Sequence, residues 1–152
     1  MEQLILQIAN LLNKVSSSFN EIKEGKWMRE ANRGIELSGK TVGIIGFGNT
    51  GSAFAKLLSS FDVTVLAYDK FKFGFGHGHI HEVSLEQICK CSNVISFHVP
   101  LTDETYHMAD EQFFDMCKLQ PVILNTCRGK IICTEAICNA LETKQIGAAG
   151  LD

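Results

Sequence analysis

A glycine-rich hexapeptide at residues 46–51, GFGNTG, has the spacing of a loop that binds a diphosphate. It follows the apolar run 42–45 and precedes a segment with helical spacing, which is the context that such a loop requires. Gly46 permits a tight turn, Gly48 lets a diphosphate approach the backbone, and Gly51 lets the helix pack closely on the strand. Free N–H groups and the dipole at the helix start then attract the phosphate charge. A glycine-rich turn without a ligand is the alternative interpretation.

An acidic residue at the end of the next apolar run supplies the second half of the pattern. Asp69 follows the run 63–67 and lies 18 residues after Gly51. A carboxylate at this point accepts hydrogen bonds from the hydroxyls of an adenosine ribose, and it repels a 2′-phosphate. The pattern therefore favours NAD over NADP, although Lys70 and Lys72 weaken that preference. The alternatives are a plain turn residue and a related nucleotide domain that binds another ligand, such as S-adenosylmethionine.

From Lys40 onward, short apolar runs alternate with segments whose apolar residues recur at helical spacing. Apolar runs of this kind are typical of strands buried on both faces, and strand–helix alternation produces right-handed βαβ units. We therefore expect a Rossmann-type, doubly wound α/β fold with a mostly parallel sheet and helices on both faces. The expected strands are 42–45, 63–67, 94–97, 122–124 and 147–151, with a sixth near 80–83. The expected helices are 52–61, 85–91, 111–118 and 135–144, the second opened by a capping box at Ser84 and Gln87.

An amphipathic segment precedes this alternation. Apolar residues between positions 2 and 23 recur at steps of three and four, which places them on one face of a helix. Such a helix packs either on its own domain or on another domain or subunit. We expect residues 1–39 to form this connecting helix and a linker, and residues 40–152 to form an NAD-binding Rossmann domain. Trp27, in the polar stretch after the helix, is expected to anchor the linker to the domain surface.

Five ordered motifs cover nearly the whole chain. They are GKW at 25–27, ELSGKTVGIIG at 36–46, HVPLT at 98–102 with Thr105, NTCRG at 125–129 and GLD at 150–152. By these motifs the chain resembles the NAD-binding domain of the D-isomer-specific 2-hydroxyacid dehydrogenases, especially their phosphoglycerate-dehydrogenase-like members. The resemblance implies NAD as cofactor. It also implies hydride transfer between NAD(H) and a 2-hydroxyacid or 2-oxoacid in a full-length parent, with 3-phosphoglycerate as the leading substrate.

The resemblance further implies a role for each residue that matches a motif. Arg128 matches the arginine that binds the substrate carboxylate and keto oxygen, a task suited to a guanidinium that stays charged and donates two parallel hydrogen bonds. It would also stabilise negative charge on the substrate oxygen, and it is the one catalytic residue expected within the chain. The residues placed around the cofactor are Asn49 and Thr50 at the diphosphate, Asp69 at the ribose, Val99 and Pro100 at the pocket border, Thr126 and Cys127 beside the nicotinamide, and Asp152 at its carboxamide.

The family's acid–base histidine, and the glutamate that orients it, belong downstream of Asp152. The chain stops there, so we expect the nucleotide-binding domain of a larger dehydrogenase, inactive by itself. A non-catalytic NAD-sensing or partner-binding module is the alternative function. The resemblance also implies that the NAD domains associate as a homodimer.

Composition limits the remaining classes of function. The chain has 152 residues, of which 45% are hydrophobic and 20% charged, and its net charge of −3 gives no reason to expect a nucleic-acid or membrane partner. No secretory signal is visible, so we expect a cytoplasmic protein whose six cysteines are reduced and mostly buried. His98 is assigned to the cofactor pocket or to packing. His77, His79 and His81 are assigned to a solvated loop, and no metal site is expected.

Overall fold

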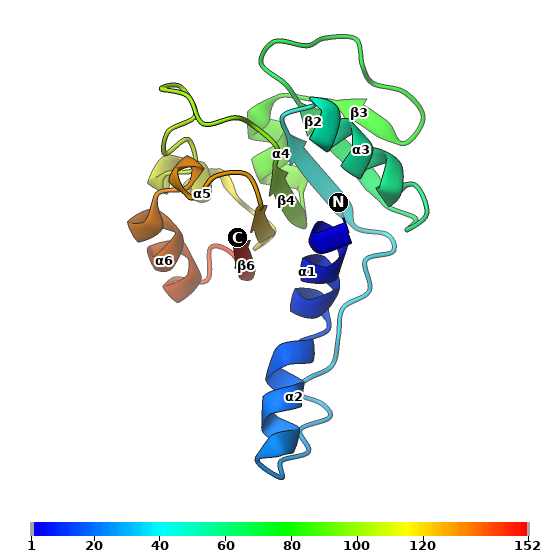
Figure 1. The fold of residues 1–152 in the computed structure, drawn as a ribbon, viewed down its shortest axis with the longest axis vertical. Helices are drawn as coiled ribbons and strands as arrows, with labels where there is room; N and C mark the ends of the chain where they lie inside the picture. Colours follow the sequence, from blue (N-terminus) through cyan, green and yellow to red (C-terminus); the bar gives the residue numbers. More distant parts are fainter. Residues whose placement is uncertain (1, 152) are drawn as a thin grey trace.

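Six short strands pair side by side into one sheet, in the order β3-β2-β1-β4-β5-β6 (Figure 1). This computed structural model describes residues 2–151, so the predicted site residue Asp152 lies outside the described part of the chain. All five strand pairs are parallel, which confirms the expected doubly wound α/β fold. The strands are β1 (Thr41–Ile45), β2 (Thr64–Tyr68), β3 (Ile80–Glu82), β4 (Val94–Phe97), β5 (Val122–Asn125) and β6 (Ala148–Leu151).

Helices cover both faces of this sheet, as expected. The helices on one face are α1 (Glu2–Leu12) and α3 (Asn49–Leu58), and those on the other are α4 (Leu85–Cys91), α5 (Glu111–Met116) and α6 (Thr134–Glu142). A 3₁₀ turn, η1 (Gly129–Ile131), precedes α6. The capping box at the start of α4 is confirmed, whereas α3 begins three residues earlier than residue 52.

The strands are apolar on both sides because each side faces a layer of helices. Along β1, Val42 and Ile44 pack toward α1 and α3, while Ile45 packs toward the layer of α4, α5 and α6. The chain moves outward from β1 through β2 to β3, then returns to place β4 on the other side of β1. Such a reversal leaves a crevice at the carboxyl ends of β1 and β4, where ligands of open α/β sheets bind.

The expected single helix over residues 2–23 is wrong, because the structure has two helices, α1 and α2 (Val15–Lys23). Lys14 adopts a left-handed conformation with φ 50° and ψ 36°, which breaks the helical path. The side-chain oxygen of Asn10 accepts hydrogen bonds from the N–H and Oγ of Ser16, at 3.0 and 2.9 Å, and so stabilises the start of α2.

The two helices have different surroundings. Leu4 and Ile8 of α1 are 1% and 2% exposed, so this helix packs on its own domain. In contrast, α2 extends away from the sheet, and the chain then returns to β1 along it (Figure 1). Trp27 is 79% exposed and does not anchor the linker to the domain, so that expectation is wrong. It lines a groove of about 220 Å³ beside α2 instead.

The six cysteines are all free thiols, but they are not mostly buried. Cys89 and Cys117 lie in the core, whereas Cys91 and Cys138 are exposed on their helices. Among the helices of residues 2–151, none has both the length and the apolar character needed to cross a bilayer.

The cap of α4 gives a first testable prediction. Ser84 Oγ accepts the Gln87 N–H at 3.2 Å, and Gln87 Oε1 accepts the Ser84 N–H at 3.1 Å. Ser84→Ala removes half of this reciprocal pair and should lower the free energy of unfolding by about 1 kcal/mol, measured by urea titration. Ser60→Ala, in an exposed turn, should change it by less than about 0.5 kcal/mol. Equal losses in the two variants would contradict a role for the cap.

Candidate functional site

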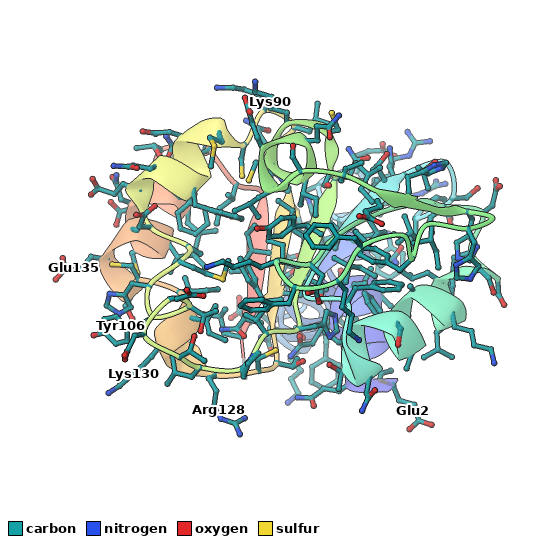
Figure 2. All side chains as sticks on the ribbon, turned by 90° about the horizontal axis from the view of Figure 1, so that it is seen from above. Glu2, Lys90, Tyr106, Arg128, Lys130 and Glu135 are labelled. Carbon is teal, nitrogen blue, oxygen red and sulfur yellow. The ribbon has the colours of Figure 1, made fainter. Side chains whose placement is uncertain are left out.

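The predicted site residues lie at one edge of the sheet, where the parallel strands end. They follow four different strands: residues 46–51 after β1, Asp69 after β2, Val99 and Pro100 after β4, and Thr126, Cys127 and Arg128 after β5. Because parallel strands end at a common edge, residues far apart in the sequence become neighbours there. Figure 2 shows the Arg128 side chain extending outward from the ribbon at this edge.

The glycine loop turns so tightly that two of its glycines have no space for a side chain. Gly46 has a φ of +94°, and a Cβ there would lie 2.6 Å from the carbonyl oxygen of His98. A Cβ on Gly51 would overlap the carbonyl oxygen of Gly46, so this glycine lets the helix start against the turn. A Cβ on Gly48 would meet nothing within 4 Å. Gly48 therefore borders open space, which a ligand can occupy.

The start of α3 faces this open space. Gly48 is the N-cap residue of α3 and has no side chain to accept a hydrogen bond from the first N–H groups of the helix. Asn49 and Thr50 form the exposed first turn, and no acidic residue lies in that turn. Such a helix end has N–H donors and the positive end of the helix dipole available for an anion. The loop therefore fits the diphosphate of a dinucleotide.

The Asp69 carboxylate joins the loop after β2 to the glycine loop. Its Oδ2 accepts the N–H of Phe47 at 2.7 Å, and its Oδ1 accepts the N–H groups of Phe71 and Lys72 at 2.9 and 3.1 Å. Lys72 Nζ in turn donates to the Phe47 carbonyl at 3.2 Å. A carboxylate offers about four acceptor positions. Asp69 thus keeps acceptor capacity for a further donor, such as a sugar hydroxyl, beside the glycine loop.

The backbone of His98 packs against the glycine loop and holds it in place. Its N–H donates to the Ile45 carbonyl at 2.7 Å, and its own carbonyl lies against Gly46. Its ring nitrogen Nε2 lies 2.9 Å from the Oγ of buried Ser96, and the ring lies 5.4 Å from that of Phe54. Burial lowers the pKa of His98 to about 4, so its imidazole is neutral near pH 7. Of the two expected roles for this histidine, these contacts favour packing.

Asn125 organises the turn that carries Arg128. This side chain is 2% exposed; its Nδ2 donates to the Arg128 carbonyl at 2.9 Å, and its Oδ1 accepts the Cys127 N–H at 3.0 Å. Cys127 Sγ lies 2.8 Å from the carbonyl oxygen of Phe97, which ties the turn to the end of β4. No role was predicted for Asn125 beyond its place in the motif at residues 125–129. The sequence feature that could have indicated its role is a polar residue at the end of an otherwise apolar strand.

The three alternating histidines are not all in a solvated loop. His81 lies within β3, and His79 Nε2 lies 3.0 Å from the carbonyl oxygen of Ala55 in α3. His77 Nδ1 lies 2.8 Å from the Phe75 carbonyl oxygen. Within residues 2–151, no three side chains of His, Cys, Asp or Glu gather closely enough to hold a metal ion.

The fold and the site together define the class of protein to which this chain belongs. A doubly wound parallel sheet, a glycine turn opening onto a helix start, and a carboxylate at the end of the neighbouring strand are the features of a dinucleotide-binding α/β domain.

Comparisons with known proteins identify the family within that class. Residues 5–152 match the family "D-isomer specific 2-hydroxyacid dehydrogenase, NAD binding domain". The chain belongs to this family and forms its NAD-binding domain, with NAD as the cofactor.

Three relatives illustrate the similarity. A 2-hydroxyacid dehydrogenase A of Aspergillus oryzae is 36% identical over 99% of this chain and 44% of its own length. A D-3-phosphoglycerate dehydrogenase of Archaeoglobus fulgidus is 34% identical over 99% of this chain and 29% of its own. The solved structure of an NAD-dependent formate dehydrogenase from Staphylococcus aureus, in complex with NAD, has a TM-score of 0.92 at 31% identity, over 99% of this chain and 46% of that chain. The chain thus spans less than half the length of these relatives.

The buried imidazole gives a second prediction. The folded protein takes up a proton at His98 only near pH 4, whereas the unfolded chain does so near 6.5. The unfolded state therefore binds more protons between these values, and the free energy of unfolding falls as the pH drops from about 6.5 to about 4. The share of His98 in this loss is about 3 kcal/mol, at 1.36 kcal/mol for each pKa unit.

The measurement is a series of urea titrations across that pH range. His98→Asn should flatten the dependence, and His81→Asn, which changes an exposed histidine, should leave the slope as in the unmodified protein. The comparison uses slopes, so it holds even where His98→Asn lowers stability at every pH. An unchanged slope in His98→Asn would refute the buried neutral imidazole.

Proposed function

We propose that this NAD-binding domain serves a dehydrogenase that transfers hydride between NAD(H) and a D-2-hydroxyacid or the matching 2-oxoacid. The observation that carries the proposal is the glycine turn with Asp69 bonded to the N–H of Phe47. Family membership supports the reaction class, and the three relatives carry names of enzymes with different substrates. We propose 3-phosphoglycerate as the first substrate to test, by resemblance to the phosphoglycerate dehydrogenases.

Each residue at the sheet edge has a proposed task. The diphosphate lies against Gly48 and the exposed turn of Asn49 and Thr50, where backbone N–H groups meet its charge, while Gly46 and Gly51 permit the tight turn that forms this part of the cofactor site. The Asp69 carboxylate accepts hydrogen bonds from the hydroxyls of the adenosine ribose. The remaining contacts to the cofactor come from Val99, Pro100, Thr126, Cys127 and, outside the described residues, Asp152. NAD, when bound, supplies or accepts the hydride.

Arg128 is the proposed substrate-binding and catalytic residue. It is exposed, and its Nη1 donates to the carbonyl of Cys127 at 2.7 Å, which leaves further donors of the guanidinium for a substrate carboxylate. The Asn125 side chain fixes the backbone on both sides of this turn. Arg128 would then hold the substrate and stabilise the negative charge on its oxygen.

The proton that accompanies hydride transfer needs a separate acid–base group. His98 does not suit this task because it is buried and its pKa is lowered to about 4. His77 and His79 instead contact the backbone carbonyls of Phe75 and Ala55. We propose that a histidine and a glutamate outside this chain complete the reaction, and that the chain alone does not turn over. Nothing in residues 2–151 favours the alternative of a non-catalytic module.

The glycine loop gives the test of the proposed cofactor site. Gly48→Ala places a methyl group in the open space beside the loop, where the diphosphate would approach. NADH binding, measured by titration calorimetry, should weaken at least about tenfold, because each 1.4 kcal/mol of lost interaction is a factor of ten. The free energy of unfolding should change by no more than about 1 kcal/mol.

Gly129→Ala is the matched control, since its Cβ also meets nothing within 4 Å. Gly129 follows Arg128 and lies outside the glycine loop. The NADH affinity of Gly129→Ala should stay within about twofold of that of the unmodified chain, a change much smaller than the tenfold loss that corresponds to 1.4 kcal/mol. Saturable binding of S-adenosylmethionine without binding of NADH would overturn the proposed function, as would full NADH affinity in Gly48→Ala.

We also propose that the protein is cytoplasmic and forms a homodimer through α2. Six free thiols suit a reducing compartment. Val15, Phe19 and Ile22 on α2 are 55–58% exposed, and Trp27 and Met28 extend the same apolar surface. Exposed apolar surface of this extent is typical of a protein interface, and a second copy of the chain presents the same surface for a two-fold contact.

Light scattering tests the dimer. The unmodified chain should have the mass of two chains, and the double variant Phe19→Glu, Ile22→Glu should have the mass of one, because buried like charges would face each other. Leu119→Glu changes an exposed leucine away from α2 and should leave the dimer intact. A monomeric mass for the unmodified chain at high concentration would exclude this interface.

A further inference from the structure

An ion pair connects the loops that follow β2 and β4. Lys70 Nζ lies 2.7 Å from Glu104 Oε2, and both side chains are exposed. In the sheet, β1 lies between β2 and β4, so the pair joins the two loops on either side of the glycine loop. Both loops lie in the upper half of Figure 1, at the end of the sheet where α3 begins. The pair therefore lies at the border of the proposed adenosine site.

Lys70 occupies a position with a specific chemical consequence. It directly follows Asp69, the carboxylate proposed to accept the ribose hydroxyls. In dinucleotide-binding folds, a cation near this carboxylate is what accommodates the 2′-phosphate of NADP. Lys70 has the charge for that contact, and a lysine can shift its flexible stem toward a phosphate.

Two contacts keep the Lys70 ammonium group from binding a 2′-phosphate. Glu104 neutralises its charge, and the ring of Phe71 lies 5.6 Å below it. The other lysine of the loop, Lys72, donates to the Phe47 carbonyl and so serves the glycine loop.

We propose that Glu104 is a specificity-determining residue, which keeps Lys70 from a 2′-phosphate and so strengthens the preference for NAD(H) over NADP(H). The proposal rests on the proposed cofactor site, and specifically on Asp69 at the ribose. Glu104 lies 35 residues beyond Asp69 in the sequence. It acts through Lys70 and needs no contact with the cofactor.

The experiment is a titration of NADH and of NADPH into the unmodified chain and its variants. Glu104→Gln should tighten NADPH binding by about fivefold, the upper range for an exposed charge pair, and leave NADH affinity within about twofold. The gain should shrink as salt is raised, because exposed charges are screened. Lys70→Gln should weaken NADPH binding in the Glu104→Gln background and remove the gain.

Asp103→Asn provides the matched control, since Asp103 is exposed in the same loop and loses the same charge. It should change the ratio of NADPH to NADH affinity by less than about twofold, within the small range of unpaired surface charges. A gain in Asp103→Asn equal to that in Glu104→Gln would overturn the proposal in favour of a general charge effect. A gain that persists with Lys70→Gln, or no gain at all, would also overturn it.

These outcomes separate this inference from the proposed function. If the unmodified chain does not bind NADH, the cofactor site itself fails. If it binds NADH normally and the affinity ratio of Glu104→Gln is unchanged, only the role of Glu104 fails.

Discussion

The hydrogen bond from the Phe47 N–H to the Asp69 carboxylate is the contact on which the geometry of the site depends. It links the turn after β1 to the loop after β2, two segments that the sheet only brings near each other. The turn has little freedom of its own, because His98 closes one side and the start of α3 closes the other. With the Asp69 oxygens fixed by three backbone donors, the open space beside Gly48 and the carboxylate keep a constant relation before any ligand arrives. Such preorganisation lowers the ordering cost of binding.

At the same edge of the sheet, buried polar residues support the backbone, and exposed residues are available to a ligand. Ser96, His98 and Asn125 are buried polar residues whose side chains hydrogen-bond within the protein. They hold the backbone at the ends of β4 and β5, while the exposed residues at this edge, among them Thr50 and Arg128, face solvent. A buried polar group that is fully paired fixes one arrangement of its neighbours, since any other would leave it unpaired. The buried residues thereby give exposed loops a defined shape.

Most of the fold followed from sequence patterns with short-range physical causes. Apolar runs predicted all six strands to within about one residue, and the glycine loop and Asp69 were placed at adjacent strand ends by their spacing alone. The break at Lys14 escaped prediction because the apolar pattern continues through it, and the Asn10–Ser16 contact that stabilises the start of the second helix leaves no trace in that pattern. Trp27 was misjudged because an aromatic residue signals a contact without naming the partner. The roles of Asn125 and Glu104 depend on tertiary neighbours, which spacing does not reveal.

The sulfur of Cys127 illustrates how such a site resists chemical damage. Burial raises the pKa of this thiol more than the Val99 N–H and the Arg128 charge lower it, and its Sγ is near the Phe97 carbonyl. Thiolate, and not thiol, is the form that peroxides attack. Because burial lowers the thiolate fraction of Cys127, this thiol should be oxidised to sulfenic acid more slowly than an exposed one, although it borders the charge of Arg128. The turn thus holds a small thiol beside Arg128 in its less reactive, protonated form.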